Sequence, residues 1–247
     1  MIELKNFSKT YNSHKRADAS GFAIDNLNMA VKTGAITGLL GVNGSGKTTI
    51  LKAICGFQCP TGGEILIDGV STEDAPEKVM ELVGYVPEIP LLPGSMTVWE
   101  FLQFAGEVHG LVGDTLRAAL ESVIKECSLE KFTDKKIKTL SKGQQQRVSF
   151  AQAIIHNPPN LVLDEPISGL DPAQIIQMRD LIKKLAKNKA ILMSTHILQE
   201  VYSLCDTLYV MNNGTIVAQG TEAEIVKDTG SKDLEAAFLK LSTTEGD

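Results

Sequence analysis

The segment GVNGSGKT, residues 41–48, has a residue pattern that can bind phosphate groups. It fits the spacing G-x-x-x-x-G-K-[ST] and stands between the strand-like stretch AITGLL and the helix-like stretch TTILKAICG. Glycines let successive backbone N–H groups converge on phosphate oxygens, and the positive end of the following helix adds to the attraction. We therefore expect Lys47 to reach the β and γ phosphates of a nucleotide and the Thr48 hydroxyl to ligate Mg²⁺.

A plain glycine-rich turn is the alternative interpretation of residues 41–48. The Lys-Thr pair in register with a strand and a helix argues against that alternative. The pattern by itself does not separate transporters from kinases, GTPases or motor proteins, because one phosphate-binding loop serves many functions.

Two adjacent carboxylates, Asp164 and Glu165, follow the apolar run in LVLDEP, residues 161–166. Ligands of parallel sheets usually bind at the carboxyl ends of strands, which is where this pair is expected. Asp164 can hold the Mg²⁺ shell, while Glu165 can polarise an attacking water and act as a general base. The alternative is a carboxylate that only caps a helix or a strand end.

A third polar segment, LSKGQQQRV at residues 140–148, has no evident packing role. We expect Ser141 and Gly143 to precede a helix, so that a hydroxyl, bare backbone amides and the helix dipole together form an anion site. Ser141 and Gln144 also fit a capping box, which is a purely structural alternative. One residue can serve each purpose in different states.

The elements that position these residues follow from the apolar patterning, which predicts an α/β fold. The first third predicts strands with turns between them, and the middle predicts a set of helices that starts with a capping box at Thr97 and Glu100. The last third predicts short buried strands alternating with helices, as in a parallel sheet, and then helices from Thr221 onward. The predicted strands lie at 2–11, 22–31, 35–41, 62–69, 160–164 and 190–195, and the helices at 48–56, 97–110, 114–129, 144–157, 172–187 and 197–205.

The composition is that of an ordinary globular chain, with 247 residues of which 43% are hydrophobic and 22% charged. A net charge of −6 argues against nucleic acid as a partner. No apolar run is long enough to span a bilayer and no leader pattern is present, so we expect a cytoplasmic protein. The cysteines Cys55, Cys59, Cys127 and Cys205 lack metal-ligand spacing and are expected to be reduced thiols.

Taken in order, five segments resemble the ATP-binding subunit of an ABC transporter: GVNGSGKTT, LSKGQQQRV, LVLDEP, SGLD at 168–171 and STHILQE, which contains His196. The match covers nearly the whole chain. It implies one ABC ATPase domain over 1–247, with a RecA-like P-loop NTPase core, an antiparallel β subdomain and an inserted α-helical subdomain. The resemblance implies that residues 1–88 and 158–247 form the core with its β subdomain, and that residues 89–157 form the helical insert.

The family resemblance also implies how each motif works. Two such chains sandwich two ATP molecules head to tail, so LSKGQQQRV would contact ATP held by a second, identical or related subunit. The catalytic residues would be Glu165, His196 and Lys47, the Mg²⁺ ligands Thr48, Glu88 and Asp164, and Asp171 would communicate across the dimer. The ATP-binding residues would be Tyr11, Gly41, Asn43, Gly44, Ser45, Gly46, Lys47, Thr48, Thr49, Ser141, Gly143 and Gln144. Tyr11 would stack on adenine, although a tyrosine at a strand end is also common as core or rim.

Two features depart from the family pattern. The family usually has Gln after a Tyr-x-Pro run, whereas GYVPE offers Glu88, whose carboxylate can still ligate Mg²⁺ but adds negative charge near the phosphates. We hypothesise that Glu88 keeps the coupling role. The second is the longer stretch at 12–21, interpreted as a surface hairpin loop with a solvated basic tip at His14, Lys15 and Arg16.

The resemblance implies an ATPase that powers transport through separate membrane-spanning subunits, from the cytoplasmic face of the cell membrane. GYVPE together with STHILQEV is more similar to the ABC-2 type exporters than to nutrient importers. A permease helix would dock on a groove around Glu88 and the helical insert, near Val98, Trp99 and Phe101, although such residues are more often core. The alternative function is a soluble ABC ATPase of an assembly system such as iron–sulfur cluster assembly.

Overall fold

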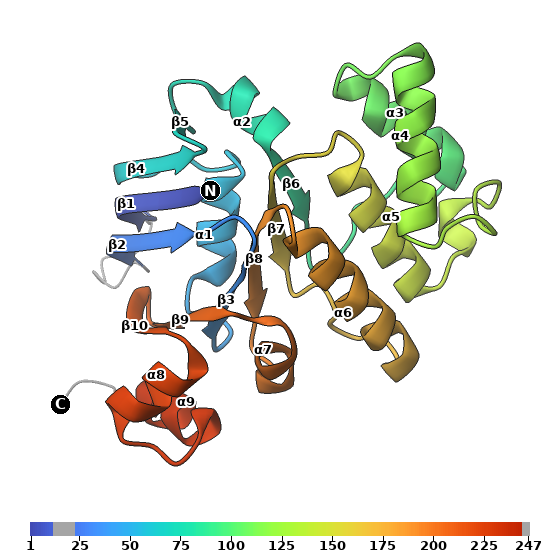
Figure 1. Ribbon diagram of the computed structural model, residues 1–247. Helices are drawn as coiled ribbons and strands as arrows, with labels where there is room; N and C mark the ends of the chain where they lie inside the picture. Colours follow the sequence, from blue (N-terminus) through green and yellow to red (C-terminus); the bar gives the residue numbers. More distant parts are fainter. Residues whose placement is uncertain (12–22, 244–247) are drawn as a thin grey trace.

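Two sheets form the framework of the protein in a computed structural model, which describes residues 1–11 and 23–243 (Figure 1). The smaller sheet is antiparallel and has the strand order β2-β1-β4-β5. Its strands are β1 (Ile2–Thr10), β2 (Ala23–Val31), β4 (Gly62–Ile67) and β5 (Val70–Ser71). The predicted antiparallel subdomain in the first third of the chain is therefore present. The predicted hairpin loop at 12–21, with His14, Lys15 and Arg16, lies outside the described residues.

The larger sheet has the strand order β10-β9-β3-β8-β7-β6 and is parallel except for β10. Its strands are β3 (Ile36–Gly41), β6 (Val83–Val86), β7 (Asn160–Asp164), β8 (Ala190–Thr195), β9 (Thr207–Asn212) and β10 (Thr215–Gly220). Every residue of β3, β7 and β8 is buried, because helices or the second sheet cover both faces, which explains their continuous apolar runs. The carboxyl ends of these three strands lie side by side at one edge.

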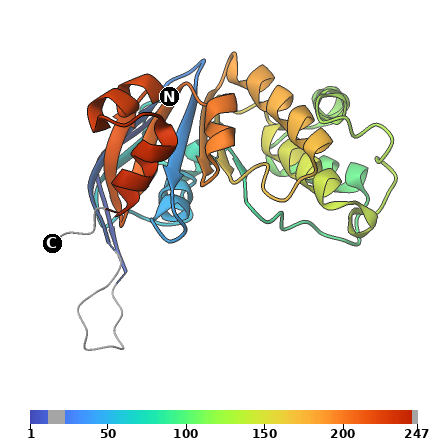
Figure 2. The same cartoon turned by 90° about the horizontal axis from the view of Figure 1, so that it is seen from below.

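Helices surround the larger sheet and divide into groups (Figures 1 and 2). α3 (Val98–Val108), α4 (Gly113–Glu126), the short 3-10 helix Ile137–Thr139 and α5 (Lys142–Ile154) gather on the side away from the antiparallel sheet. These elements lie inside the predicted insert at 89–157, whose boundaries stay a prediction. The remaining helices are α1 (Lys47–Ile54), α2 (Pro76–Leu82), α6 (Pro172–Ala186), α7 (Leu198–Leu204), α8 (Glu222–Thr229) and α9 (Leu234–Thr243).

Capping boxes start three of these helices. Thr97 and Glu100 close the N-terminus of α3 as predicted, and Ser141 with Gln144 does the same for α5. Helix α5 begins at Lys142, so Gly143 lies in its first turn and does not precede the helix as expected. The reason is that the Ser141 side chain already accepts the N–H of Gln144, which makes Ser141 the N-cap.

The helical group shares one hydrophobic core with α6 and with residues of the larger sheet. Val98 is fully buried, and Trp99 and Phe101 pack against the same cluster. All three residues therefore contribute to the core, which was the alternative to a place near the docking groove. None of the helices among residues 1–11 and 23–243 has the length and apolar character that crossing a membrane requires.

Several elements were not predicted. β8 was expected to be the last strand, but β9 and β10 follow it and form an antiparallel hairpin. The two strands are joined at Asn213 and Gly214, which both have positive φ. An Asn-Gly pair between apolar runs is a strong hairpin signal, so the sequence contained the information. α2 and β6 are seven and four residues long, which is too short for a clear apolar period.

Candidate phosphate and catalytic site

The loop at residues 41–48 joins β3 to α1 and turns through backbone conformations that favour glycine. Gly44 and Gly46 have φ of 83° and 109°, in the left-handed region where a side chain would be strained. At Gly41 a Cβ atom would come 2.6 Å from the Met211 carbonyl oxygen, so that position has no room for a side chain. The loop backbone can therefore curl around an anion at the N-terminus of α1.

Lys47 is the first residue of α1 and is almost entirely buried. Its ammonium group donates hydrogen bonds to the carbonyl oxygens of Gly41 at 2.7 Å and Val42 at 3.2 Å. Burial lowers the pKa of Lys47, and the negative charges of Glu165 and Asp164 oppose this effect. A cation between a glycine-rich loop and two carboxylates is suited to phosphate oxygens.

Asp164 is the last residue of β7, and each of its two carboxylate oxygens accepts a hydrogen bond. The Thr48 hydroxyl of α1 donates to Oδ2 at 3.2 Å, and the Ser194 hydroxyl of β8 donates to Oδ1 at 2.6 Å. Hydroxyl and carboxylate oxygens are the ligands that hard divalent cations take. Ser194 was not predicted as a site residue, because the contact depends on β8 lying beside β7.

Glu165 follows Asp164 with a φ of 46°, a strained conformation for a residue with a side chain. Its N–H donates to the Ser194 hydroxyl at 3.1 Å, which holds this turn. One carboxylate oxygen, Oε1, lies 2.8 Å from Nδ1 of His196, while Oε2 is buried and has no hydrogen-bond partner among the described residues. Glu165 thus presents a buried acceptor beside an imidazole, an arrangement that can take a proton from water.

A cavity of about 270 Å³ opens in front of these groups. Tyr11 is not among its lining residues; the Tyr11 hydroxyl donates to Gln58 Oε1 at 2.5 Å and lies 3.5 Å from the Thr49 hydroxyl. Ser45, within the loop, is buried and does not line the cavity. Ten predicted site residues do line the cavity: Asn43, Gly44, Gly46, Lys47, Thr48, Thr49, Glu88, Asp164, Glu165 and His196.

The LSKG segment, residues 140–143, lies apart from this cavity and meets the start of α6. A Cβ atom on Gly143 would come 2.2 Å from Gln174 of α6, and one on Gly169 would come 2.3 Å from the Lys142 ammonium. Asp171 is the N-cap of α6, where its carboxylate accepts the N–H of Gln174 at 2.9 Å. The fold thus joins the LSKG segment to the SGLD segment on a surface outside the phosphate cavity.

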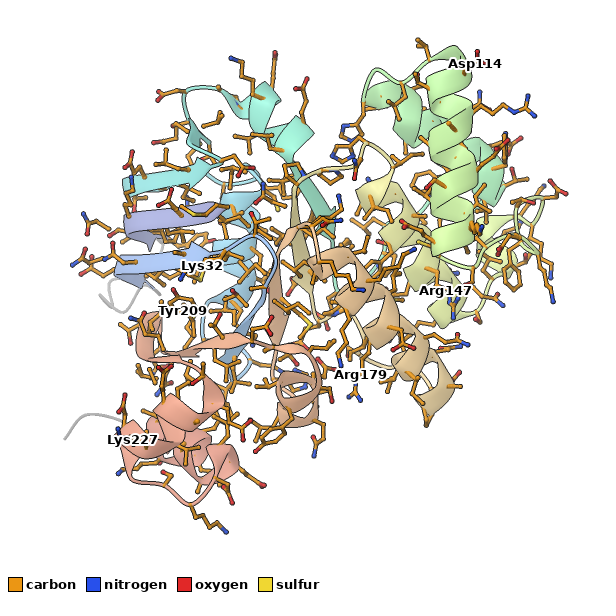
Figure 3. The ribbon with its side chains drawn as sticks, in the orientation of Figure 1. Lys32, Asp114, Arg147, Arg179, Tyr209 and Lys227 are labelled. Atoms are coloured by element: carbon orange, nitrogen blue, oxygen red, sulfur yellow. The ribbon has the colours of Figure 1, made fainter. Side chains whose placement is uncertain are left out.

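Arg147 holds this pair of helices together and was not predicted. From α5, its guanidinium donates to the Cys127 carbonyl oxygen at 3.1 Å and to the side chain of Gln177 on α6. Figure 3 labels it where the helical group approaches α6. A single cation therefore couples the LSKG helix to the helix that begins at Asp171.

A second, larger groove of about 800 Å³ adjoins the first cavity and shares Thr48, Glu88 and Asp164 with it. Within it the rings of His109 and His156 stack with centroids 3.7 Å apart. Burial lowers the pKa of His156 to about 4, so it is neutral near pH 7. Val98, Trp99 and Phe101 do not line the groove. Its lining includes the exposed apolar residues Phe57, Met80, Ile89, Leu91 and Val108.

Comparison with known proteins identifies related sequences. Residues 24–168 match the family model described as ABC transporter. The ABC transporter ATP-binding protein NatA of Bacillus subtilis is 31% identical over 242 residues, which are 97% of each chain. The Nod factor export ATP-binding protein I of Ralstonia nicotianae is 36% identical over 204 residues, which are 82% of this chain and 64% of that protein.

Solved structures agree with these relatives. A structure described as the ATP binding subunit of an ABC transporter has a TM-score of 0.86 and 31% identity, covering 97% of this chain and 98% of that one. A dimeric post-hydrolysis state of the ATP-binding cassette MJ0796, bound to ADP and Pi, has a TM-score of 0.78 and 27% identity, covering 90% and 98%. The predicted RecA-like P-loop NTPase fold is confirmed. The loop, the acidic pair and these relatives together place the chain in the ABC transporter family, as an ATP-binding subunit with ATPase activity.

Proposed function

We propose that two copies of this chain, or this chain and a related one, close around two ATP molecules and power transport through separate membrane-spanning subunits. The observation that carries this proposal is the separation between the LSKG segment and the phosphate cavity of the same chain. The LSKG segment lies at a helix N-terminus, which can bind phosphate, but it does not line the nucleotide site of its own chain. The phosphate that it binds would therefore come from a nucleotide held by a second chain. The MJ0796 cassette, whose structure is described as dimeric and bound to ADP and Pi, supports the dimer.

Within each site the described residues divide the work. Lys47 and the loop amides would bind the β and γ phosphates, while Thr48, Asp164 and Glu88 would supply oxygen ligands to Mg²⁺. The bound Mg²⁺ would neutralise charge on the phosphate oxygens. Glu165 would take the proton of the attacking water through its free oxygen, and His196 would hold Glu165 and contact the γ phosphate. Tyr11 and Asp171 keep their proposed roles in adenine stacking and dimer communication.

We expect Glu88→Ala to raise the Mg²⁺ concentration needed for half-maximal ATPase activity by about tenfold, because a residue that holds or orients a metal ligand contributes about 10- to 100-fold to affinity. Glu88→Gln should raise this Mg²⁺ concentration less, because the amide oxygen of glutamine can still ligate the cation. Steady-state ATPase rates over a magnesium titration would measure this, with the exposed Glu77→Ala on α2 as the control. Unchanged rates and unchanged magnesium dependence in both Glu88 variants would refute the coupling role.

The larger groove is the proposed docking surface for a cytoplasmic helix of the membrane subunit, and it would place this chain on the cytoplasmic face of the membrane. Its apolar rim and its neutral His156 suit an apolar segment, and it adjoins the nucleotide site through Glu88. Movement of the docked helix would thus be linked to the residue beside the phosphates.

Phe57→Asp should release the chain from membranes without loss of ATP binding, because a charge would be buried under the docked helix. Leu239→Asp on α9 is a matched control, since Phe57 and Leu239 are 60% and 58% exposed. Sedimentation with membranes that contain the cognate permease measures the effect. Equal release by both substitutions, or by neither, would contradict docking in this groove.

Export is the proposed direction, supported by the Nod factor export relative and by the resemblance of GYVPE and STHILQEV to ABC-2 type exporters. A soluble assembly ATPase remains the less favoured alternative, since both relatives are named as transporter or export proteins. Membrane sedimentation separates the two functions, because an assembly ATPase would not depend on a permease.

A further inference from the structure

In the turn after β8, hydrogen bonds link residues on both sides of His196 in the sequence. Thr195, the last residue of β8, is fully buried. Its hydroxyl donates to Oε2 of Glu200 at 2.6 Å and accepts the backbone N–H of Ile197 at 3.0 Å. One hydroxyl therefore bonds to the backbone just after His196 and to the first turn of α7 at the same time.

Glu200 is a carboxylate in an unusual place, because only 3% of its surface is exposed. Burying a charged group is costly unless it is paired and hydrogen-bonded, so an apolar residue would pack here at lower cost. Burial raises the pKa of Glu200, while the hydrogen bond from Thr195 and, to a smaller extent, the positive charge of Arg179 favour its ionised form. Arg179, labelled in Figure 3, extends from α6 to the Gln199 carbonyl oxygen on α7 at 3.4 Å.

The same turn carries the imidazole that contacts Glu165. The His196 side chain is 44% exposed, whereas the Glu165 side chain is 7% exposed. The 2.8 Å contact between His196 Nδ1 and Glu165 Oε1 therefore depends on the backbone at 195–197. The hydrogen bonds of Thr195 to the Ile197 N–H and to Glu200 hold this backbone before and after His196.

We propose that Thr195 and Glu200 are positioning residues for ATP hydrolysis, which hold the 195–197 turn so that His196 meets Glu165. This inference rests on the proposed roles of Glu165 and His196. Neither positioning residue would touch the nucleotide, so the pair should affect turnover and leave ATP binding intact. Misplacement of a catalytic group by about 1 Å can lower a rate about 100-fold, so a buried hydrogen bond behind it can matter.

Thr195→Val keeps the shape of the side chain and removes the hydroxyl, so we expect kcat to fall about tenfold or more while KM for ATP stays within about twofold. Thr195→Ser keeps the hydroxyl and should retain nearly full kcat. Glu200→Gln keeps an oxygen that accepts the Thr195 bond and should resemble wild type, whereas Glu200→Met should resemble Thr195→Val. Steady-state ATPase assays of the full chain with Mg²⁺, alongside melting temperature, measure these differences.

A mutant cycle with His196→Ala tests whether the pair acts through the imidazole. Single-turnover hydrolysis with excess protein, which follows slow rates, should show that Thr195→Val causes no further loss once His196 is absent. Full kcat in Thr195→Val, equal loss in Thr195→Ser, or the same loss with and without His196 would each overturn the positioning role. Wild-type turnover in His196→Ala would instead refute the proposed role of His196, so the two failures are distinguishable.

Discussion

Glu165→Gln should hydrolyse ATP about 100- to 10,000-fold more slowly than the wild-type chain, because a positioned general base typically contributes that factor. Glutamine has nearly the same shape as glutamate but cannot accept the proton of the attacking water. Its amide can keep the contact with His196, and the strained turn is held by the backbone bond to Ser194, so the surroundings should not change. The variant should therefore bind ATP, and it should remain in the ATP-closed dimer that hydrolysis would otherwise open.

Steady-state ATPase rates and light scattering with and without ATP would measure both effects. Glu222→Gln, the same substitution at an exposed position in α8, is the matched control and should behave as wild type. Turnover at the wild-type rate in Glu165→Gln would show that another group is the base. A monomer in the presence of ATP would contradict the proposed sandwich instead.

Ser141→Arg should abolish ATP-driven dimerisation and spare ATP binding by the isolated chain. Ser141 is exposed at the N-terminus of α5, outside the phosphate cavity of its own chain, so a long side chain there would not obstruct that cavity. In the proposed dimer the same side chain would occupy the space of the opposing γ phosphate. Loss of the N-cap would cost only about 1 kcal/mol of stability, which is too little to explain loss of dimerisation by unfolding.

Thr221→Arg is a matched control, because Thr221 caps α8 in the same kind of capping box by which Ser141 caps α5. Figure 1 shows α8 well apart from α5. Light scattering in the Glu165→Gln background would report dimerisation, and a fluorescent ATP analogue would report binding. Dimers of Ser141→Arg with unaltered affinity for one another would exclude the LSKG segment from the interface. Equal failure of both variants would point to helix stability as the cause.

The sequence by itself determined the features that depend on neighbouring residues. The loop at 41–48, the capping box at Thr97 and the buried strand ahead of Asp164 were all predicted, because each is a contiguous pattern with one favourable local structure. The capping box at Ser141 had been given as the structural alternative to an anion site, and it is present. The elements missed were short, such as β6, or followed the last predicted strand, such as β9 and β10. The family resemblance added the expected roles of Glu88, Asp171 and His196, which spacing alone could not supply.

Only the tertiary structure decided which of these residues meet. The strand order β3-β8-β7 differs from the order along the chain, and it brings Thr48, Asp164 and Ser194 into contact. The bond from Arg147 to Gln177 and the buried Thr195–Glu200 pair likewise depend on how separate elements pack. Such contacts join groups whose residue types are common anywhere in a chain, so their chemistry arises from position in the fold, which a local pattern does not encode.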